Sequence, residues 1–150
     1  MFDFREKTIT VMGLGSYQKG SGIGAVRFLL GRAKRVIITD FKSEKELSEQ
    51  VAQVKIWQKS MPFGKIQTEI VWRLGGHKKY DFEKVDMVVR NPDVPLNSPF
   101  LSYARQNKIP IENDITLFLR IYGVEQVVGV TGTRGKTTVT NLIYEMLRAE

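Results

Sequence analysis

The sequence predicts an α/β fold, a Rossmann-like parallel sheet with helices on both faces. Short apolar segments rich in β-branched residues alternate with longer segments whose apolar residues have helical spacing. A glycine-rich loop follows the first apolar segment, and an acidic residue ends the second. Because parallel strands have to be joined by crossover connections, usually helices, this alternation indicates a parallel sheet covered on both sides.

The expected strands lie at residues 8–12, 35–39, 66–74, 85–89 and 109–111, and the expected helices at 23–30, 43–61, 99–107 and 114–122. Ser43 with Glu46 three residues later suits a helix start, and Asn113 or Asp114 suits another. Pro62 and Gly64 are expected to end the second helix. Residues 91–95 contain two prolines and are therefore expected to form a loop.

Two domains are expected along the chain. Residues 1–123 contain every element of a complete Rossmann-like domain. Residues 124–150 read as the truncated start of a second α/β domain, with a strand over 126–130, a phosphate-binding loop and an amphipathic helix over 137–148.

The amino-acid composition limits the class of protein to which this chain can belong. The 150 residues are 42% hydrophobic, enough for one sizeable core. No apolar run approaches the roughly 20 residues of a membrane span, and the opening lacks a signal peptide. We therefore expect a soluble, cytoplasmic protein, a monomer, that contacts no membrane. The absence of cysteine excludes disulfides and thiolate chemistry, and one histidine cannot make a multi-histidine metal site.

The net charge of +7 suits an anionic partner. The basic residues are scattered and are not interleaved with aromatic residues as in an RNA-binding sheet. By charge alone, nucleotides, nucleic acids and anionic lipids all qualify as partners. Because the RNA-binding pattern is missing, we expect no nucleic acid.

The first chemical signal is the glycine-rich loop after the first strand. Gly13 and Gly15, followed by Ser16 and a helix, are expected to bring backbone amides close to a diphosphate. A dinucleotide-binding fingerprint would have its third glycine at position 18, which is Gln18 here. The competing interpretation is a turn that only packs the helix on the strand.

Asp40 ends the second strand, where dinucleotide-binding domains keep the acid that binds ribose. Its carboxylate can equally contact a base, and an acidic residue also ends strands by chance. His77, beside a Gly-Gly turn, is expected to be a surface histidine and not a catalytic base.

The second signal is a phosphate-binding loop between an apolar segment and an amphipathic helix. Its lysine, Lys136, is expected to neutralise phosphates, and the hydroxyl of Thr137 to ligate magnesium. The match covers the GKT core only, since Val130 stands where the first glycine of the motif is expected. The candidate ATP-binding residues are Gly132, Thr133, Arg134, Gly135, Lys136, Thr137 and Thr138.

The two loops, in this order and about 120 residues apart, resemble those of the Mur ligases. The GTRGKTT loop is similar to their ATP-binding loop, and VMGLG followed by VIITDFK and VDMVVRNPDVP resembles the UDP-binding domain of the family that joins D-glutamate to UDP-N-acetylmuramoyl-L-alanine. The similarity covers nearly the whole chain. It implies an ATP- and magnesium-dependent amide ligase of peptidoglycan precursor synthesis, with UDP-N-acetylmuramoyl-L-alanine and D-glutamate as substrates.

The resemblance also implies roles for residues of this chain. The amides around Gly15 and Ser16 would face the diphosphate, and Thr39 and Asp40 would meet the uracil. The family's other catalytic groups would lie beyond residue 150, so we expect no catalytic residue within the chain. The implied UDP-binding set is Gly13, Gly15, Ser16, Thr39, Asp40, Asn91, Pro92 and Asp93.

Three features depart from the family pattern. The first loop is lengthened around residues 17–21, Asn91-Pro92-Asp93 replaces a Ser-Pro-Gly-like turn, and Arg134 stands in place of an asparagine. The alternatives are an NAD(P)-binding Rossmann module, a non-catalytic nucleotide-binding scaffold, and another ligase of the Mur superfamily.

Overall fold

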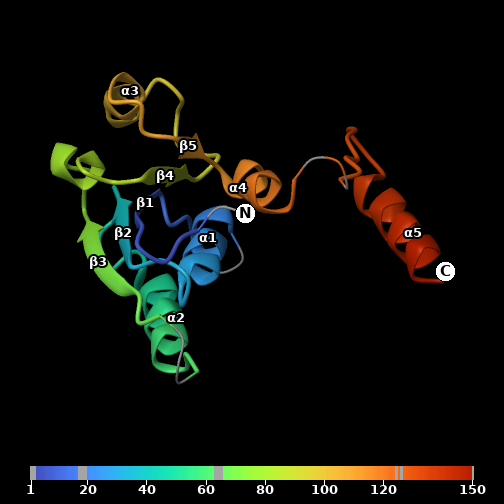
Figure 1. Cartoon of the computed structure of the whole chain (residues 1–150), viewed down its shortest axis with the longest axis horizontal. Helices are drawn as coiled ribbons and strands as arrows, with labels where there is room; N and C mark the ends of the chain where they lie inside the picture. Colours follow the sequence, from blue (N-terminus) through green and yellow to red (C-terminus); the bar gives the residue numbers. More distant parts are fainter. Residues whose placement is uncertain (1–2, 17–19, 63–65, 124, 126, 150) are drawn as a thin grey trace.

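The computed structural model describes residues 3–16, 20–62, 66–123, 125 and 127–149. Its centre is a sheet of five parallel strands in the order β3-β2-β1-β4-β5 (Figure 1). The expected Rossmann-like fold is confirmed. The strands are β1 (Thr8–Met12), β2 (Arg35–Asp40), β3 (Glu69–Leu74), β4 (Met87–Arg90) and β5 (Ile111–Glu112).

Helices cover both faces of the sheet, as Figure 1 shows. One face packs against three helices and the other against α3 with a short 3-10 helix. The first group is α1 (Ser21–Leu29), α2 (Ser48–Lys59) and α4 (Asp114–Tyr122), and the second is α3 (Pro99–Gln106) and η1 (Lys79–Phe82).

The alternation of side chains along the strands divides the core into two clusters. Ile9 and Val11 of β1 belong to the cluster under α1, α2 and α4. Met12 belongs to the cluster under α3, because successive strand residues point to opposite faces. Every residue named here is fully buried. Both faces of β1 are therefore covered, as expected for the central strand of a parallel sheet.

A local sequence signal sets the start of α4. The Asn113 side chain accepts a hydrogen bond from the Thr116 N–H at 2.8 Å, and the Thr116 hydroxyl accepts one from the Asn113 N–H at 2.8 Å. This reciprocal pair caps α4. Glu46 accepts hydrogen bonds from both the N–H and the hydroxyl of Ser43, but a turn separates this pair from α2, which begins at Ser48.

Two strands begin a few residues later than predicted, because pairing with the neighbouring strand decides where each one begins. β3 begins at Glu69, not at residue 66, because its register with β2 starts where Arg35 pairs with Glu69. β5 begins at Ile111, not at residue 109, because Ile111 is the first residue that pairs with Val88 of β4.

The C-terminal part differs from the expectation in one element. Helix α5 (Lys136–Arg148) forms as predicted, but it buries no residue, and Figure 1 shows it apart from the sheet. Residues 127–132 form no strand, although a strand was expected over 126–130; Gln126 itself lies outside the described residues. A strand needs a neighbour for its backbone hydrogen bonds, and none of the described strands pairs with this segment.

The topology creates a crevice between β1 and β4. The chain leaves β1 for α1 on one face of the sheet and leaves β4 for α3 on the other face. The loops that follow these adjacent strands therefore diverge at the carboxyl end of the sheet. Ligands of open α/β sheets bind at such a point.

The close approach of α1 to the first loop predicts how two glycine substitutions change the stability of the protein. A Cβ on Gly22 would lie 2.1 Å from the Gly13 carbonyl oxygen, whereas a Cβ on Gly24 would meet no atom within 4 Å. We expect Gly22→Ala to lower the free energy of unfolding by about 1–3 kcal/mol through overpacking. Gly24→Ala is the matched control and should be neutral or raise it by up to about 1 kcal/mol. Urea denaturation of both variants measures this; equal stability would contradict the packing described.

Candidate functional site

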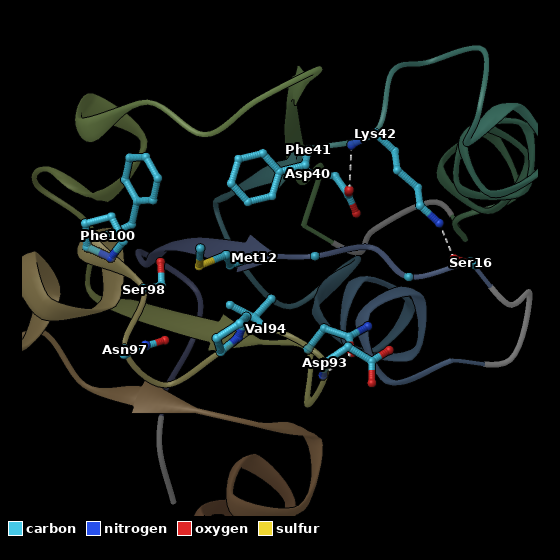
Figure 2. Close-up of a pocket in the computed structure, with 15 residues that line it drawn as sticks. Met12, Ser16, Asp40, Phe41, Lys42, Asp93, Val94, Asn97, Ser98 and Phe100 are labelled. Carbon is cyan, nitrogen blue, oxygen red and sulfur yellow. Dashed lines mark hydrogen bonds between the residues drawn. The ribbon is translucent and has the colours of Figure 1, made fainter.

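A cavity of about 610 Å³ lies at the carboxyl ends of β1, β2 and β4 (Figure 2). This volume is within the range of small-molecule sites. Its wall combines the glycine loop, the residues after β2 and the loop that leads to α3. The lining residues are Met12, Gly13, Gly15, Ser16, Asp40, Phe41, Lys42, Asn91, Asp93, Val94, Pro95, Asn97, Ser98, Pro99 and Phe100.

The glycine loop follows a path that side chains would obstruct. Gly13 and Gly15 have φ values of +84° and +87°, in the left-handed region that favours glycine. A Cβ on Gly13 would lie 3.0 Å from Asn91 Cβ, and a Cβ on Gly15 would lie 2.9 Å from Asn91 Nδ2. The loop therefore packs directly on the loop after β4, and α1 packs against it at Gly22. These contacts explain glycine at positions 13 and 15 of the loop and at position 22 of α1.

Asp40, at the end of β2, connects two backbone segments of the cavity wall. Only 8% of its surface is exposed. Asp40 Oδ2 accepts a hydrogen bond from the Leu14 N–H at 2.8 Å, and Oδ1 accepts one from the Lys42 N–H at 2.9 Å. Both carboxylate oxygens thus fix backbone segments of the cavity wall. Asp40 lines the cavity, and its contact with a base stays a prediction.

Thr39 is fully buried and does not line this cavity. Its hydroxyl hydrogen-bonds His77 Nδ1 at 2.8 Å, and its carbonyl accepts a hydrogen bond from the Gly13 N–H at 2.8 Å. The structure therefore brings Thr39 to the site as a support for the glycine loop. Its side chain points to His77 behind the cavity wall.

The loop after β4 is rigidly held. The Asn91 N–H donates to the Met12 carbonyl at 2.8 Å, and Asn91 Oδ1 accepts a hydrogen bond from the Asp93 N–H at 3.1 Å. Arg90 Nη1 donates to three loop carbonyls, those of Asn91, Pro92 and Val94, at 3.2–3.3 Å. The predicted proline-rich loop is confirmed, and Asn91 and Asp93 lie on the cavity wall.

A smaller cavity of about 190 Å³ lies at the start of α1, between the glycine loop and Asn91-Pro92-Asp93. It includes Gly15, Ser16, Gly20 and Ser21. The N-terminus of a helix carries unpaired N–H groups and partial positive charge, so this position favours an anion. The exposed carboxylate of Asp93 on the opposite side suits a hydroxyl donor better than a phosphate.

Sequence reasoning did not single out nine of the residues that line the larger cavity, and three of these nine add distinct chemistry to it. Lys42 adds a cation, and its ammonium donates a hydrogen bond to the Ser16 hydroxyl (Figure 2). Phe41 and Phe100 add aromatic rings. The sequence could have indicated Phe41 and Lys42, because both directly follow Asp40 at the end of the strand. Phe100 comes from α3, and only the fold brings it here.

His77 is not the surface residue that was expected. It is half-buried, hydrogen-bonded to Thr39, and its ring centroid lies 4.2 Å from that of Phe41 and 5.4 Å from that of Phe100. Burial lowers the pKa of His77, and the negative charges of Asp40 and Asp81 only partly oppose this effect. The fold thus places the imidazole inside an aromatic cluster behind the cavity.

The second loop that the sequence predicts to bind phosphate does not line this cavity and lies on the exposed segment before α5. Gly135 is left-handed, with φ +78°, and precedes the first residue of the helix. Lys136 Nζ donates a hydrogen bond to the Gly132 carbonyl at 2.7 Å, so the lysine side chain curls over its own loop. Thr133, Arg134, Thr137 and Thr138 are exposed. Gly132 to Thr138 therefore form one exposed loop and the first turn of α5.

Two further searches covered only the described residues. Among them, no group of three or more histidine, cysteine, aspartate or glutamate side chains is arranged to hold a metal ion. Within the same part of the chain, no helix has the length and apolarity that crossing a membrane requires.

A parallel sheet with a glycine loop, a strand-end acid and a cavity at its topological switch point defines a Rossmann-like ligand-binding domain. Comparison with known families narrows this class. Residues 7–113 match the model of the "Mur ligase MurD-like, N-terminal domain" family. The chain belongs to this family.

Curated relatives agree over nearly the whole chain. A UDP-N-acetylmuramoylalanine–D-glutamate ligase of Borreliella burgdorferi (strain ZS7) is 36% identical over 97% of this chain and 29% of its own length. One from Roseiflexus sp. (strain RS-1) is 38% identical over 96% of this chain and 28% of its own length. The chain thus spans less than a third of the length of these relatives.

Among solved structures, a pseudomurein peptide ligase type C from Methanothermus fervidus matches with a TM-score of 0.49 and 24% identity. The match covers 96% of this chain and 26% of that one.

The two hydrogen bonds of Asp40 predict the effect of a conservative change. Asp40→Asn keeps one acceptor but turns an NH₂ group toward one of the two backbone donors. We expect the free energy of unfolding to fall by about 1–3 kcal/mol and the Leu14 amide to exchange faster with solvent. Asp93→Asn, an exposed carboxylate on the same cavity, is the control and should change stability by less than about 0.5 kcal/mol. Equal effects in urea denaturation would exclude the supporting role of Asp40.

The half-buried imidazole of His77 predicts a pH dependence of stability. The folded-state pKa of His77 is lowered, so the unfolded chain takes up the proton first as the pH falls below about 6.5. Stability should therefore be highest above this pH and decrease toward pH 5.5. His77 is the only histidine, and His77→Gln should flatten the melting temperature between pH 7.5 and 5.5. A variant with the full wild-type slope would show that other groups cause it.

Proposed function

We propose that residues 1–123 bind the UDP portion of UDP-N-acetylmuramoyl-L-alanine, as the first domain of an ATP-dependent ligase that adds D-glutamate to this substrate in peptidoglycan precursor synthesis. The observation that carries the proposal is the pair of cavities at the switch point: the glycine loop lines both, Lys42 lines the larger one, and the start of α1 lines the smaller one. Membership of the MurD-like family and the names of the curated relatives support it.

The chemistry of the wall suggests how the ligand lies. The amides of Gly15 and Ser16, with Lys42, would hold the diphosphate, because backbone N–H groups and an ammonium complement its charge. Asp93 and the side chain of Asn91, on either side of Pro92, would face the sugar hydroxyls. The uracil would then lie beside Asp40, with Thr39 supporting the wall from behind.

Residues 124–150 would begin the ATP-binding domain. A helix that starts after a left-handed glycine offers free N–H groups, and Lys136 lies over the same loop. These residues suit ATP phosphates, and Thr137 would contribute a hydroxyl to the magnesium ion. In the proposed reaction ATP phosphorylates the substrate carboxylate, and the amine of D-glutamate then displaces phosphate to form the amide. This chain would supply substrate and phosphate binding.

Calorimetric titration of the chain with UDP, NADH and ATP tests the proposal. UDP should bind to residues 1–123 and raise the melting temperature, NADH should bind more weakly, and the chain alone should form no ADP. Binding of NADH in preference to UDP would point instead to a dinucleotide module, and ADP formation would contradict the division of labour between the domains.

A charge-removing variant locates the ligand. Lys42→Met should weaken UDP binding about tenfold or more, since hydrogen bonds to charged groups contribute about 1.5–3 kcal/mol. Lys45→Met, an exposed lysine three residues along the chain, is the matched control and should bind UDP as the wild type does. Equal affinity of both variants would place the diphosphate elsewhere.

A further inference from the structure

The aromatic residue Phe41 lies at the rim of the larger cavity. Phe41 follows Asp40 directly, and 71% of its surface is exposed. Its ring nevertheless has a defined position, because it contacts the His77 ring with a centroid distance of 4.2 Å and an interplanar angle of 60°. Figure 2 shows the ring directed over the cavity, above Met12.

Two groups of contacts restrain Phe41. Its chain neighbour Lys42 donates its N–H to the Asp40 carboxylate, which fixes the backbone after β2. His77, on the other side, is anchored by the buried Thr39 hydroxyl at 2.8 Å. An exposed ring that the fold holds in place can contact a ligand with little further loss of side-chain freedom.

Phe41 and Lys42 direct different chemistry to different parts of the cavity. The Lys42 ammonium reaches the Ser16 hydroxyl at the glycine loop, whereas the Phe41 ring lies on the side of Phe100 (Figure 2). Phe100 is itself backed by Phe82, with ring centroids 5.3 Å apart in a stacked arrangement. The cavity thus has a cationic, amide-rich end and an aromatic end.

We propose that Phe41 provides the stacking surface for the planar base of the bound nucleotide, and that His77 is the positioning residue that holds the Phe41 ring. The inference rests on the proposed function and names a determinant of affinity at the same site. A nucleobase has an apolar π face that matches an aromatic ring. Stacking on Phe41 would add to the polar contacts that the base makes near Asp40, whose two oxygens accept backbone hydrogen bonds.

Three variants separate stacking from apolar packing. Phe41→Leu keeps an apolar side chain without a ring and should weaken UDP binding about tenfold or more, the range of one base-aromatic contact. Phe41→Trp keeps a ring and should bind within about threefold of the wild type. Phe118→Leu is the matched control, a phenylalanine 48% exposed on α4 and outside this cavity, and should leave affinity unchanged.

Fluorescence of the Phe41→Trp variant gives a direct readout. UDP should quench its emission more than that of the wild type, because only the variant has an indole against the base. Melting temperatures within about 2 °C of the wild type would show that the variants are folded. His77→Ala should weaken UDP binding in the wild-type background and have little further effect in Phe41→Leu.

The outcomes distinguish this inference from the proposed function. If the wild-type chain binds no UDP, the proposed function fails and the role of Phe41 with it. If the wild type binds UDP but Phe41→Leu binds it equally well, or Phe41→Trp shows no UDP-dependent quenching, the proposed function stands and stacking on Phe41 is excluded.

Discussion

The candidate site depends on one buried carboxylate. Asp40 ends β2 and accepts hydrogen bonds from the N–H groups of Leu14 and Lys42. The first bond ties the glycine loop after β1 to the neighbouring strand, and the second fixes the segment that carries Phe41 and Lys42 into the cavity. A buried charge is costly unless it is hydrogen-bonded, so the two backbone donors and the carboxylate stabilise one another. An acid at this strand end therefore organises the site before any ligand arrives.

The glycine loop serves packing and ligand access together. Gly22 allows α1 to touch the Gly13 carbonyl, while Gly13 and Gly15 let Asn91 pack against the loop. The sequence offered these as competing interpretations, a packing turn or an anion-binding loop. The structure shows that they are compatible, because close helix packing is what aims the start of α1 at the smaller cavity. The same contacts that stabilise the fold thus shape the space for an anion.

The two loops that the sequence predicts to bind phosphate stand in different structural contexts. The first is embedded between β1, α1 and the loop after β4, with most neighbouring side chains buried. The second precedes a helix whose apolar residues, including Val139, Leu142 and Met146, are exposed. Apolar residues at this helical spacing are typical of a face that packs against other elements.

The sequence by itself determined the elements, because periodicity, caps and breakers act locally. The strand over 8–12, the helix over 114–122 and its Asn113 cap, and the proline loop at 91–95 all follow from neighbouring residues. The glycine loop and Asp40 were recognisable for the same reason. Tertiary structure alone decided which residues meet at the site. Phe100 comes from α3, and the fold buries Thr39 against His77, a residue that the sequence placed at the surface. Pairing with a neighbouring strand also decided where β3 and β5 begin. Residues 127–130 form no strand, because none of the described strands pairs with them.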